Sequence, residues 1–334
     1  MKKSILGLAA LALLASCNND EDIQLADKAV IGFNGVFVEN STRANDLTKD
    51  NILDFGVFGS VEKGANSGLI FNNTEVYKSG TAFKYDLPQY WVTSADYDFV
   101  AIAPFTDAHW SYRLTTSTVA RTGVITFDNA AAAANQDLLF AYATRTTAEA
   151  ITTQPEAVGF TFNHMLSRVF FTFTNDFAPN SNITLKVTNV KINNAHKTGT
   201  LAINDGVAAE AWIVDGNSGD NAFARLFGAA RAAGEANANA FAGQQSASTE
   251  HFYLIPANAT YNVTFDVELF QAGVSLKNYR HSVDVALNMA KGCSYNIIAK
   301  LNQNNVTGDP NEDLQKIEFD VETVKAWTNA TDIN

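Results

Sequence analysis

The stretch YNVTFDVELF, residues 261–270, alternates apolar and polar side chains, with apolar residues at 261, 263, 265, 267 and 269. Successive side chains of a β-strand point to opposite faces, so a period of two is typical of a strand with one face buried. A helix would instead repeat its apolar residues every three or four positions. The stretch therefore predicts a long, half-buried strand.

Short runs of the same kind recur along the chain, rich in Val, Ile, Thr, Phe and Tyr and separated by clusters of Asn, Asp, Gly and Ser. Strands are predicted at 51–58, 96–103, 158–162, 167–174, 183–192 and 294–301. This pattern is typical of an all-β sandwich protein. Helical periodicity is scarce. The best candidate is the Ala-rich stretch 221–243, either one surface helix or a long loop, which we interpret as an insertion.

Length and composition indicate two domains of modest size. The 334 residues are 46% hydrophobic and include 23 Phe, enough to bury two cores. A polar stretch around Pro155 predicts the boundary, giving domains at 44–155 and 156–334. The formal net charge of −12 disfavours nucleic acid and anionic membrane surfaces as partners.

The N-terminus has the three regions of a secretory signal peptide, predicted at 1–16. Lys2 and Lys3 are followed by an apolar run at 5–14 and by small residues before Cys17. This run is about half of the roughly 20 residues that a membrane span needs. The tetrapeptide LASC, residues 14–17, resembles the lipobox of bacterial lipoproteins, which implies acylation of Cys17, for example by palmitate, and anchoring in the outer membrane. The acidic run at 18–22 is similar to a signal for the outer face, although a solvated linker would have the same composition.

The search for catalytic and metal-binding patterns is negative. The five histidines have no short ligand spacing, and no nucleophile elbow, phosphate loop or dinucleotide fingerprint is present. We therefore expect no enzymatic activity, no metal and no cofactor. With Cys17 acylated, Cys293 has no intramolecular disulfide partner, and a buried, small apolar role is the favoured interpretation.

Several separate segments together resemble the fimbrillin-like family, also called type V pilins. The first contains Trp91, Tyr97, Asp98, Phe99, Val100, Ala101 and Pro104. The second and third contain Gln136, Asp137, Leu138, Leu139, Phe140 and Ala141, then Phe160, Phe162, His164, Met165, Leu166 and Ser167. The last contains Gly292, Tyr295, Asn296, Ile317, Phe319, Val321 and Trp327.

The resemblance implies two transthyretin-like β-sandwich domains in tandem and a lipidated N-terminal propeptide at 17–43. Arg-specific cleavage between Arg43 and Ala44 would remove this propeptide and open a groove for a strand of a neighbouring pilin subunit. A solvated loop with an ordinary arginine is the alternative. Ile31, Phe33 and Phe37 alternate within 29–38, which independently predicts a strand with one apolar face.

The candidate donor is the C-terminal segment 317–327, in which Ile317, Phe319 and Val321 alternate. The alternative is the last strand of its own domain. The predicted function is a cell-surface fimbrial subunit that serves adhesion to a host or bacterial surface ligand.

Two other function classes remain open. A non-polymerising surface lipoprotein could bind glycans or host proteins, and Trp110, Tyr112 and Trp212 could supply aromatic platforms, although burial is the commoner fate of such residues. A surface glycosidase is the third class, but no pair of carboxylates can be singled out from the sequence.

We expect Cys17→Ser to abolish acylation and surface delivery while leaving the β domains able to fold, because the thiol accepts the acyl group and lies outside both predicted domains. Metabolic labelling with a fatty acid measures this directly. Labelling of the variant at the wild-type level would contradict the lipoprotein prediction.

Overall fold

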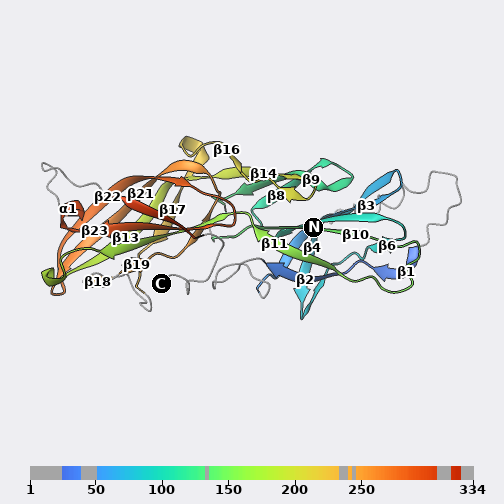
Figure 1. Cartoon of the computed structure of the whole chain (residues 1–334), viewed down its shortest axis with the longest axis horizontal. Coiled ribbons are helices and arrows are strands. Elements are labelled where there is room, and N and C mark those ends of the chain that lie inside the picture. Colours follow the sequence, from blue (N-terminus) through green and yellow to red (C-terminus); the bar gives the residue numbers. More distant parts are fainter. Residues whose placement is uncertain are drawn as a thin grey trace, which may run out of the picture. The chain divides into compact units, whose positions relative to one another are not determined.

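The computed structural model describes residues 25–38, 51–131, 135–232, 240–242, 246–306 and 317–324. Within these ranges the regular secondary structure is almost entirely β-strand, and helix is limited to α1 (Gln303–Val306) and the 3-10 turns η2 (Pro179–Ser181) and η3 (Gly219–Asn221). The all-β prediction is confirmed (Figure 1). No described helix is long and apolar enough to cross a membrane.

All seven strands predicted from the sequence are present. The opening stretch forms the middle of a longer strand, β21 (Asn258–Gln271), while β7 (Asp96–Ala103) and β23 (Ser294–Leu301) have the predicted bounds. The predicted strand at 51–58 begins later than expected and continues to Lys63. The period of two therefore identified strands well but located their ends less well.

The chain forms two compact units. The first comprises residues 1–126, 137–164 and 201–209, and the second comprises 127–136, 165–200 and 210–334. The sequence placed a boundary after Pro155, whereas β11 (Val158–His164) pairs with strands of the first unit, so residues up to His164 belong to that unit. The predicted boundary preceded this strand because its position rested on the turn signal at Pro155.

A seven-stranded sheet with the order β2-β11-β10-β7-β3-β4-β5 forms most of the first unit. Its remaining strands are β2 (Phe33–Val38), β3 (Asp54–Lys63), β4 (Asn66–Ser79), β5 (Ala82–Lys84) and β10 (Leu139–Thr146). A two-stranded sheet pairs β1 (Leu25–Val30) with β6 (Tyr90–Val92). The two end strands β2 and β5 lie beside each other, so the sheet curls around a single core.

A further sheet has the order β15-β14-β9-β8, with β16 paired to β14. Its strands are β8 (Trp110–Thr116), β9 (Val119–Asp128), β14 (Thr198–Asn204), β15 (Val207–Ala208) and β16 (Ile213–Val214).

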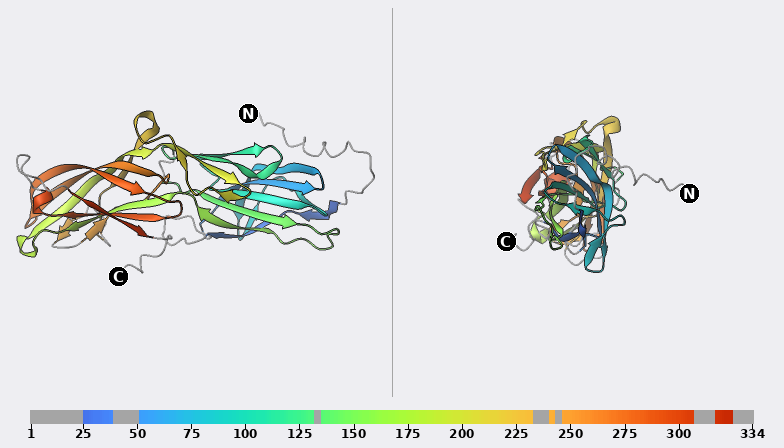
Figure 2. Two further views of the ribbon diagram at one scale, coloured as in Figure 1. Left: turned by 45° about the horizontal axis from the view of Figure 1, so that its top comes forward. Right: turned by 90° about the vertical axis from the view of Figure 1, so that its right-hand side faces the viewer.

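The second unit is a sandwich of two sheets around one core (Figure 2). One sheet has the order β19-β12-β23-β24 with β20 also on β12, and the other has the order β17-β13-β21-β22 with β18 also on β13. Their other strands are β12 (Ser167–Asn175), β13 (Ile183–His196), β17 (Ala222–Gly228), β18 (Ala240–Ala242), β19 (Ser246–Ser248), β20 (Phe252–Leu254), β22 (Val274–Asn288) and β24 (Phe319–Val324).

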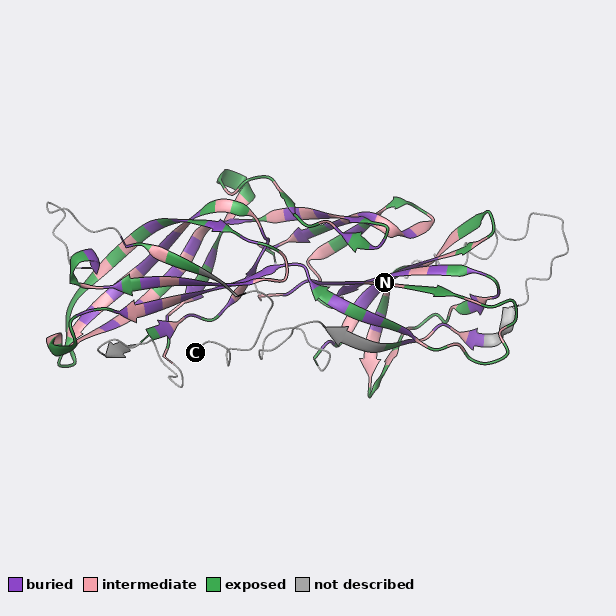
Figure 3. Ribbon diagram, viewed as in Figure 1, coloured by how far each residue is buried: buried purple, intermediate pink, exposed green. Residues whose placement is uncertain are grey.

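Burial alternates along strands that cover a core with one face. Residues of β11 are buried and exposed in strict alternation, and Figure 3 shows similar banding on other strands. By contrast, the first five residues of β12 are all buried. A strand covered on both faces is expected to lose the alternation in this way.

The Ala-rich stretch contains strands where a helix or loop was predicted. Its described part includes β17 and β18, and both pair with β13. Buried Phe227 on β17 is part of the second core. The high Ala content favoured a helix or a loop in isolation, but the free edge of β13 provides hydrogen bonds that local propensity does not register.

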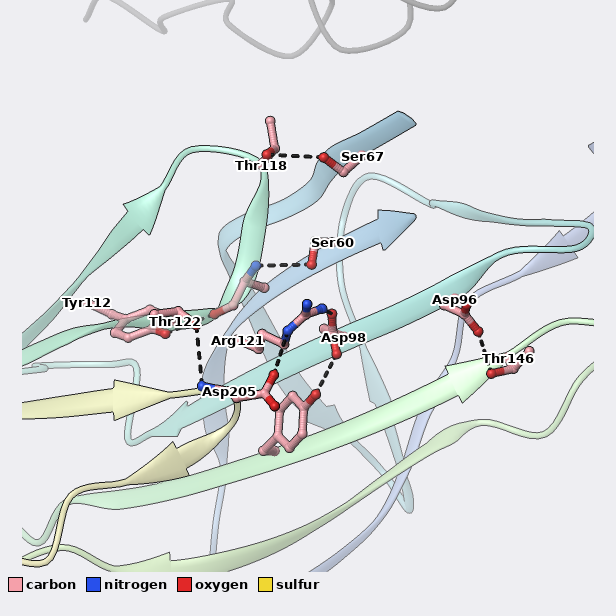
Figure 4. Close-up of polar contacts among 12 residues, drawn as sticks. Ser60, Ser67, Asp96, Asp98, Tyr112, Thr118, Arg121, Thr122, Thr146 and Asp205 are labelled. Carbon is pink, nitrogen blue, oxygen red and sulfur yellow. Dashed lines mark hydrogen bonds and ion pairs between the residues drawn. The ribbon is translucent and has the colours of Figure 1, made fainter. Parts of the chain in front are cut away.

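A polar cluster ties the turn between β14 and β15 to the seven-stranded sheet (Figure 4). Asp98 accepts hydrogen bonds from the Tyr142 hydroxyl and from Arg121 Nη1, each at 2.5 Å, and Arg121 Nε lies 2.7 Å from Asp205 Oδ1. Burial, together with the hydrogen bond to Asp98, raises the pKa of Tyr142, so the phenol remains a donor. The cluster thus joins β7, β9 and β10 to the turn at Asp205 and Gly206.

We expect Gly206→Ala to destabilise the first unit by about 3 kcal/mol, because a Cβ there would lie 2.2 to 2.5 Å from atoms of the Tyr142 ring. The matched control is Gly80→Ala. The φ of Gly80 is +68° and that of Gly206 is +78°, so both substitutions strain the backbone to a similar degree. An added Cβ at Gly80 has open space around it, so Gly80→Ala should destabilise the unit by only about 1 kcal/mol, from backbone strain alone. Urea titration of both variants measures the difference, and equal losses would contradict the steric explanation.

Candidate functional site: a buried N-terminal segment

The segment at 29–34 lies in the core of the first unit. Ile31 is fully buried and Phe33 is 4% exposed, whereas Asn34, the second residue of β2, is exposed. Two of the three residues predicted to face inward thus do so. The Phe37 side chain lies outside the described part of the structure, although its backbone is opposite Thr161 of β11.

The Phe33 ring lies among five aromatic rings of the first unit. Its centroid is 5.4 Å from that of Phe71 and 5.9 Å from that of Phe99, both edge-on, and it stacks at 5.8 Å on Phe160. Phe55 and Tyr85 complete the set. Rings at these separations favour edge-on or offset packing and add about 0.5–1.5 kcal/mol per pair beyond area burial.

The backbone of the segment is hydrogen-bonded on both sides. The Ile31 N–H donates to the Gln89 carbonyl at 2.8 Å, and the Ile31 carbonyl accepts from the Tyr85 hydroxyl at 2.6 Å. The Gly32 carbonyl accepts from the Val158 N–H at 2.8 Å. Burial raises the pKa of Tyr85, and the hydrogen bond from the Gln89 N–H opposes part of this rise. Because the pKa is raised overall, the phenol stays protonated and acts as a donor.

The position of β2 in the sheet makes it separable. It is the end strand, and it pairs in parallel with β11, with Phe33 opposite Val158 and Asn34 opposite Gly159. On its other side it lies beside β5. We call the space between β11 and β5 that this segment occupies the seam. Removing the segment would end the pairing of β1 with β6, and it would leave β11 without its parallel partner.

Several kcal/mol hold the segment in the seam. Full burial of Ile31 and of Phe33 contributes about 1.5–3 kcal/mol each, and each backbone hydrogen bond contributes about 1 kcal/mol net. Release without replacement would therefore expose an aromatic groove and unpaired polar groups. A replacement strand could recover comparable free energy.

The candidate donor residues form the C-terminal edge of the second unit. β24 pairs antiparallel with β23 at the end of its sheet. Ile317 is buried, Phe319 is half-buried and packs against the rings of Phe171, Phe173 and Phe265, and Val321 is 39% exposed. In this structure β24 is thus the last strand of its own unit, as the alternative interpretation expected.

The remaining predicted site residues are not part of the described structure. Cys17, Arg43 and Ala44 lie outside the described residues, as does Trp327. Acylation at Cys17 and cleavage after Arg43 stay predictions.

The aromatic residues considered for glycan binding are poorly placed for it. Tyr112 is 8% exposed and Trp212 is 6% exposed. Trp110 is half-buried, and its indole N–H donates to the Pro104 carbonyl at 2.6 Å. Neither Tyr112 nor Trp212 presents an open ring face to a sugar.

The sequence shows no metal-ligand spacing around His164 and did not predict a partner for it. The structure buries it, with Nδ1 2.7 Å from the equally buried Asp137. Both residues come from motif segments noted above, so their order in the motif was visible but their pairing was not. Among the described residues, no three His, Cys, Asp or Glu side chains could hold a metal ion together.

The sequence profile of a family described as fimbrillin-like matches residues 42–322. In fold, the chain is similar to a fimbrial protein from Bacteroides vulgatus, with 16% identity, a TM-score of 0.58 and coverage of 90% of this chain and 99% of that chain. At this identity the likeness establishes the fold alone.

Two other solved structures are similar with lower TM-scores. A proposed cell adhesion protein from Bacteroides ovatus has 16% identity, a TM-score of 0.46 and coverage of 88% and 95%. The fimbrial anchor protein Mfa2 from Porphyromonas gingivalis has 10% identity, a TM-score of 0.34 and coverage of 87% and 97%. No curated protein matches the sequence.

We expect Phe33→Ala to destabilise the first unit by about 3–5 kcal/mol, because it leaves a cavity among five rings. Hydrogen exchange of the Val158 amide, which donates to Gly32, should accelerate as the segment detaches more often. Asn163→Ala, on the exposed face of β11 and outside the residues paired with β2, is the control and should change stability by less than about 0.5 kcal/mol. Unchanged Val158 exchange in Phe33→Ala would show that the ring does not hold the segment.

Proposed function

The chain belongs to the fimbrillin-like family, and on that premise we propose that it is a cell-surface fimbrial subunit that assembles by strand exchange. The observation that carries this proposal is the burial of Ile31 and Phe33 in an end segment of the first unit. This segment precedes the proposed cleavage site at Arg43, so cutting there would free it from the rest of the chain.

Proteolysis would change a stable fold into one poised for assembly. Before cleavage the segment is covalently attached and returns to the seam whenever it detaches. After cleavage it can diffuse away, and the seam then presents an apolar groove beside the unpaired edge of β11, an arrangement that a second extended segment can complete. The segment is held by several kcal/mol, so exchange would be slow and would favour whichever strand fills the groove better.

The predicted lipid on Cys17 fits the same sequence of events. It would hold the precursor in the outer membrane at the cell surface, and cleavage after Arg43 would release the mature chain from its anchor. The proposed partners are other pilin subunits and the membrane, and the proposed role is adhesion to a host or bacterial surface ligand. We propose no catalytic role.

A retained, non-polymerising surface lipoprotein is the competing proposal. Its glycan-binding form is weakened by the burial of Tyr112 and Trp212. The state of the N-terminus distinguishes the two proposals. Mass spectrometry of shed protein beginning at Ala44 would support assembly, whereas acylated Cys17 would support retention.

We expect wild-type precursor treated with an Arg-specific protease to polymerise, and Arg43→Ala to remain monomeric under the same treatment. A chain truncated after Gln315 should be cleaved normally yet fail to polymerise if 317–327 is the donor. Size-exclusion chromatography and electron microscopy compare the three forms. Monomeric cleaved wild type at high concentration, or fibres from Arg43→Ala, would favour the retained lipoprotein instead.

A further inference from the structure

The segment that fills the seam and the C-terminal edge strand carry the same short pattern. The pattern is Ile-x-Phe, where x is any residue. It occurs as Ile31-Gly32-Phe33 near the N-terminus and again as Ile317-Glu318-Phe319 before the last strand. In both places Ile is buried and Phe lies among aromatic rings. β2, which begins at Phe33, and β24, which begins at Phe319, are each the end strand of a sheet and pair with one strand of it.

We propose that Ile317 and Phe319 of a second copy of this chain occupy the sites of Ile31 and Phe33, with Glu318 at the position of Gly32. This inference rests on the proposed function and specifies its partner, register and direction. The donor then runs parallel to β11, as β2 does. Because the inward side chains are identical, the replacement creates neither a cavity nor an overpacked core.

The backbone at Gly32 accepts a larger residue. Gly32 is not among the glycines with positive φ, so an L-residue fits its conformation. A Cβ added there would lie 3.4 Å from the Ala157 Cβ, at the short end of ordinary van der Waals contact. Gly32 is partly exposed and Glu318 is exposed in its own strand, so the carboxylate can point to solvent in the seam.

The polar groups of the seam recognise any strand in this register. The Gln89 carbonyl accepts from the N–H at position 31, and the Val158 N–H and Tyr85 hydroxyl donate to the carbonyls at positions 32 and 31. A donor therefore needs a free N–H at the first apolar position, which Ile317 supplies. The opposite direction would place the Phe319 ring in the fully enclosed site of Ile31, where it is larger than the side chain it replaces.

The register can be measured by disulfide trapping. In the proposed complex the Cβ atoms of residue 318 of the donor and of Ala157 are about 3.4 Å apart, close to the mean of about 3.8 Å in disulfides. We would prepare the full-length chain with Cys17→Ser, Cys293→Ser and a specific protease site inserted after Arg43. The test variant adds Glu318→Cys and Ala157→Cys.

Two further variants serve as controls. Asp320→Cys with Ala157→Cys shifts the donor thiol by two residues, about 6.6 Å along a strand, beyond disulfide reach. Gly32→Cys with Ala157→Cys places both thiols in the precursor itself. Its oxidised form should stay monomeric after proteolysis and assemble once reduced, which verifies the geometry.

The expected result is polymer that becomes covalently linked between copies through positions 318 and 157 on oxidation, with no linkage for 320 and 157. Two outcomes overturn the register but leave strand exchange intact. In the first, polymer forms and becomes linked through residue 320. In the second, polymer forms without a link through residue 318 although the Gly32→Cys control does form its disulfide. Absence of polymer from every cleaved variant under reducing conditions overturns the proposed function itself, and the inference with it.

Discussion

A buried strand edge must have its N–H and C=O groups paired, and in the first unit the outer edge of β11 depends on residues 32–38 for this. Ile31 and Phe33, at the start of this stretch, also belong to a core of aromatic and aliphatic side chains from the surrounding strands. Backbone pairing and core packing thus depend on one stretch of chain near the N-terminus. Neither requirement specifies that this stretch be covalently attached to the rest of the unit.

The walls of the seam are held by interactions that do not involve the segment. Arg121, Asp98 and Tyr142 join three strands of the first unit, and the turn at Asp205 is part of the same cluster. Phe55, Phe71 and Phe99 lie on strands β3, β4 and β7, and β3 pairs with both of the others. A groove whose walls are already ordered loses less conformational entropy when a new strand binds.

The fold class was accessible from the sequence because alternation of side chains, as in residues 261–270, is a local property. The parallel pairing of β2 with β11 and the closure of β2 against β5 were not accessible, because they join residues far apart in the chain and leave no local pattern. At the candidate site the inward direction of Ile31 and Phe33 was predictable from the same alternation. The contribution of Tyr85, and the strand character of Ala222–Gly228, depend on tertiary contacts that composition does not encode.

The place of residues 29–38 in the first unit and of β24 in the second has a consequence for growth. If the groove of one copy receives the donor of another, every contact joins two different surfaces and is head-to-tail, so the assembly extends in one direction unless its rotation closes a ring. The fibre would then be polar, with an open groove at one end and an unused donor at the other. Its length could be set by capping either end, and the two ends would require chemically different caps.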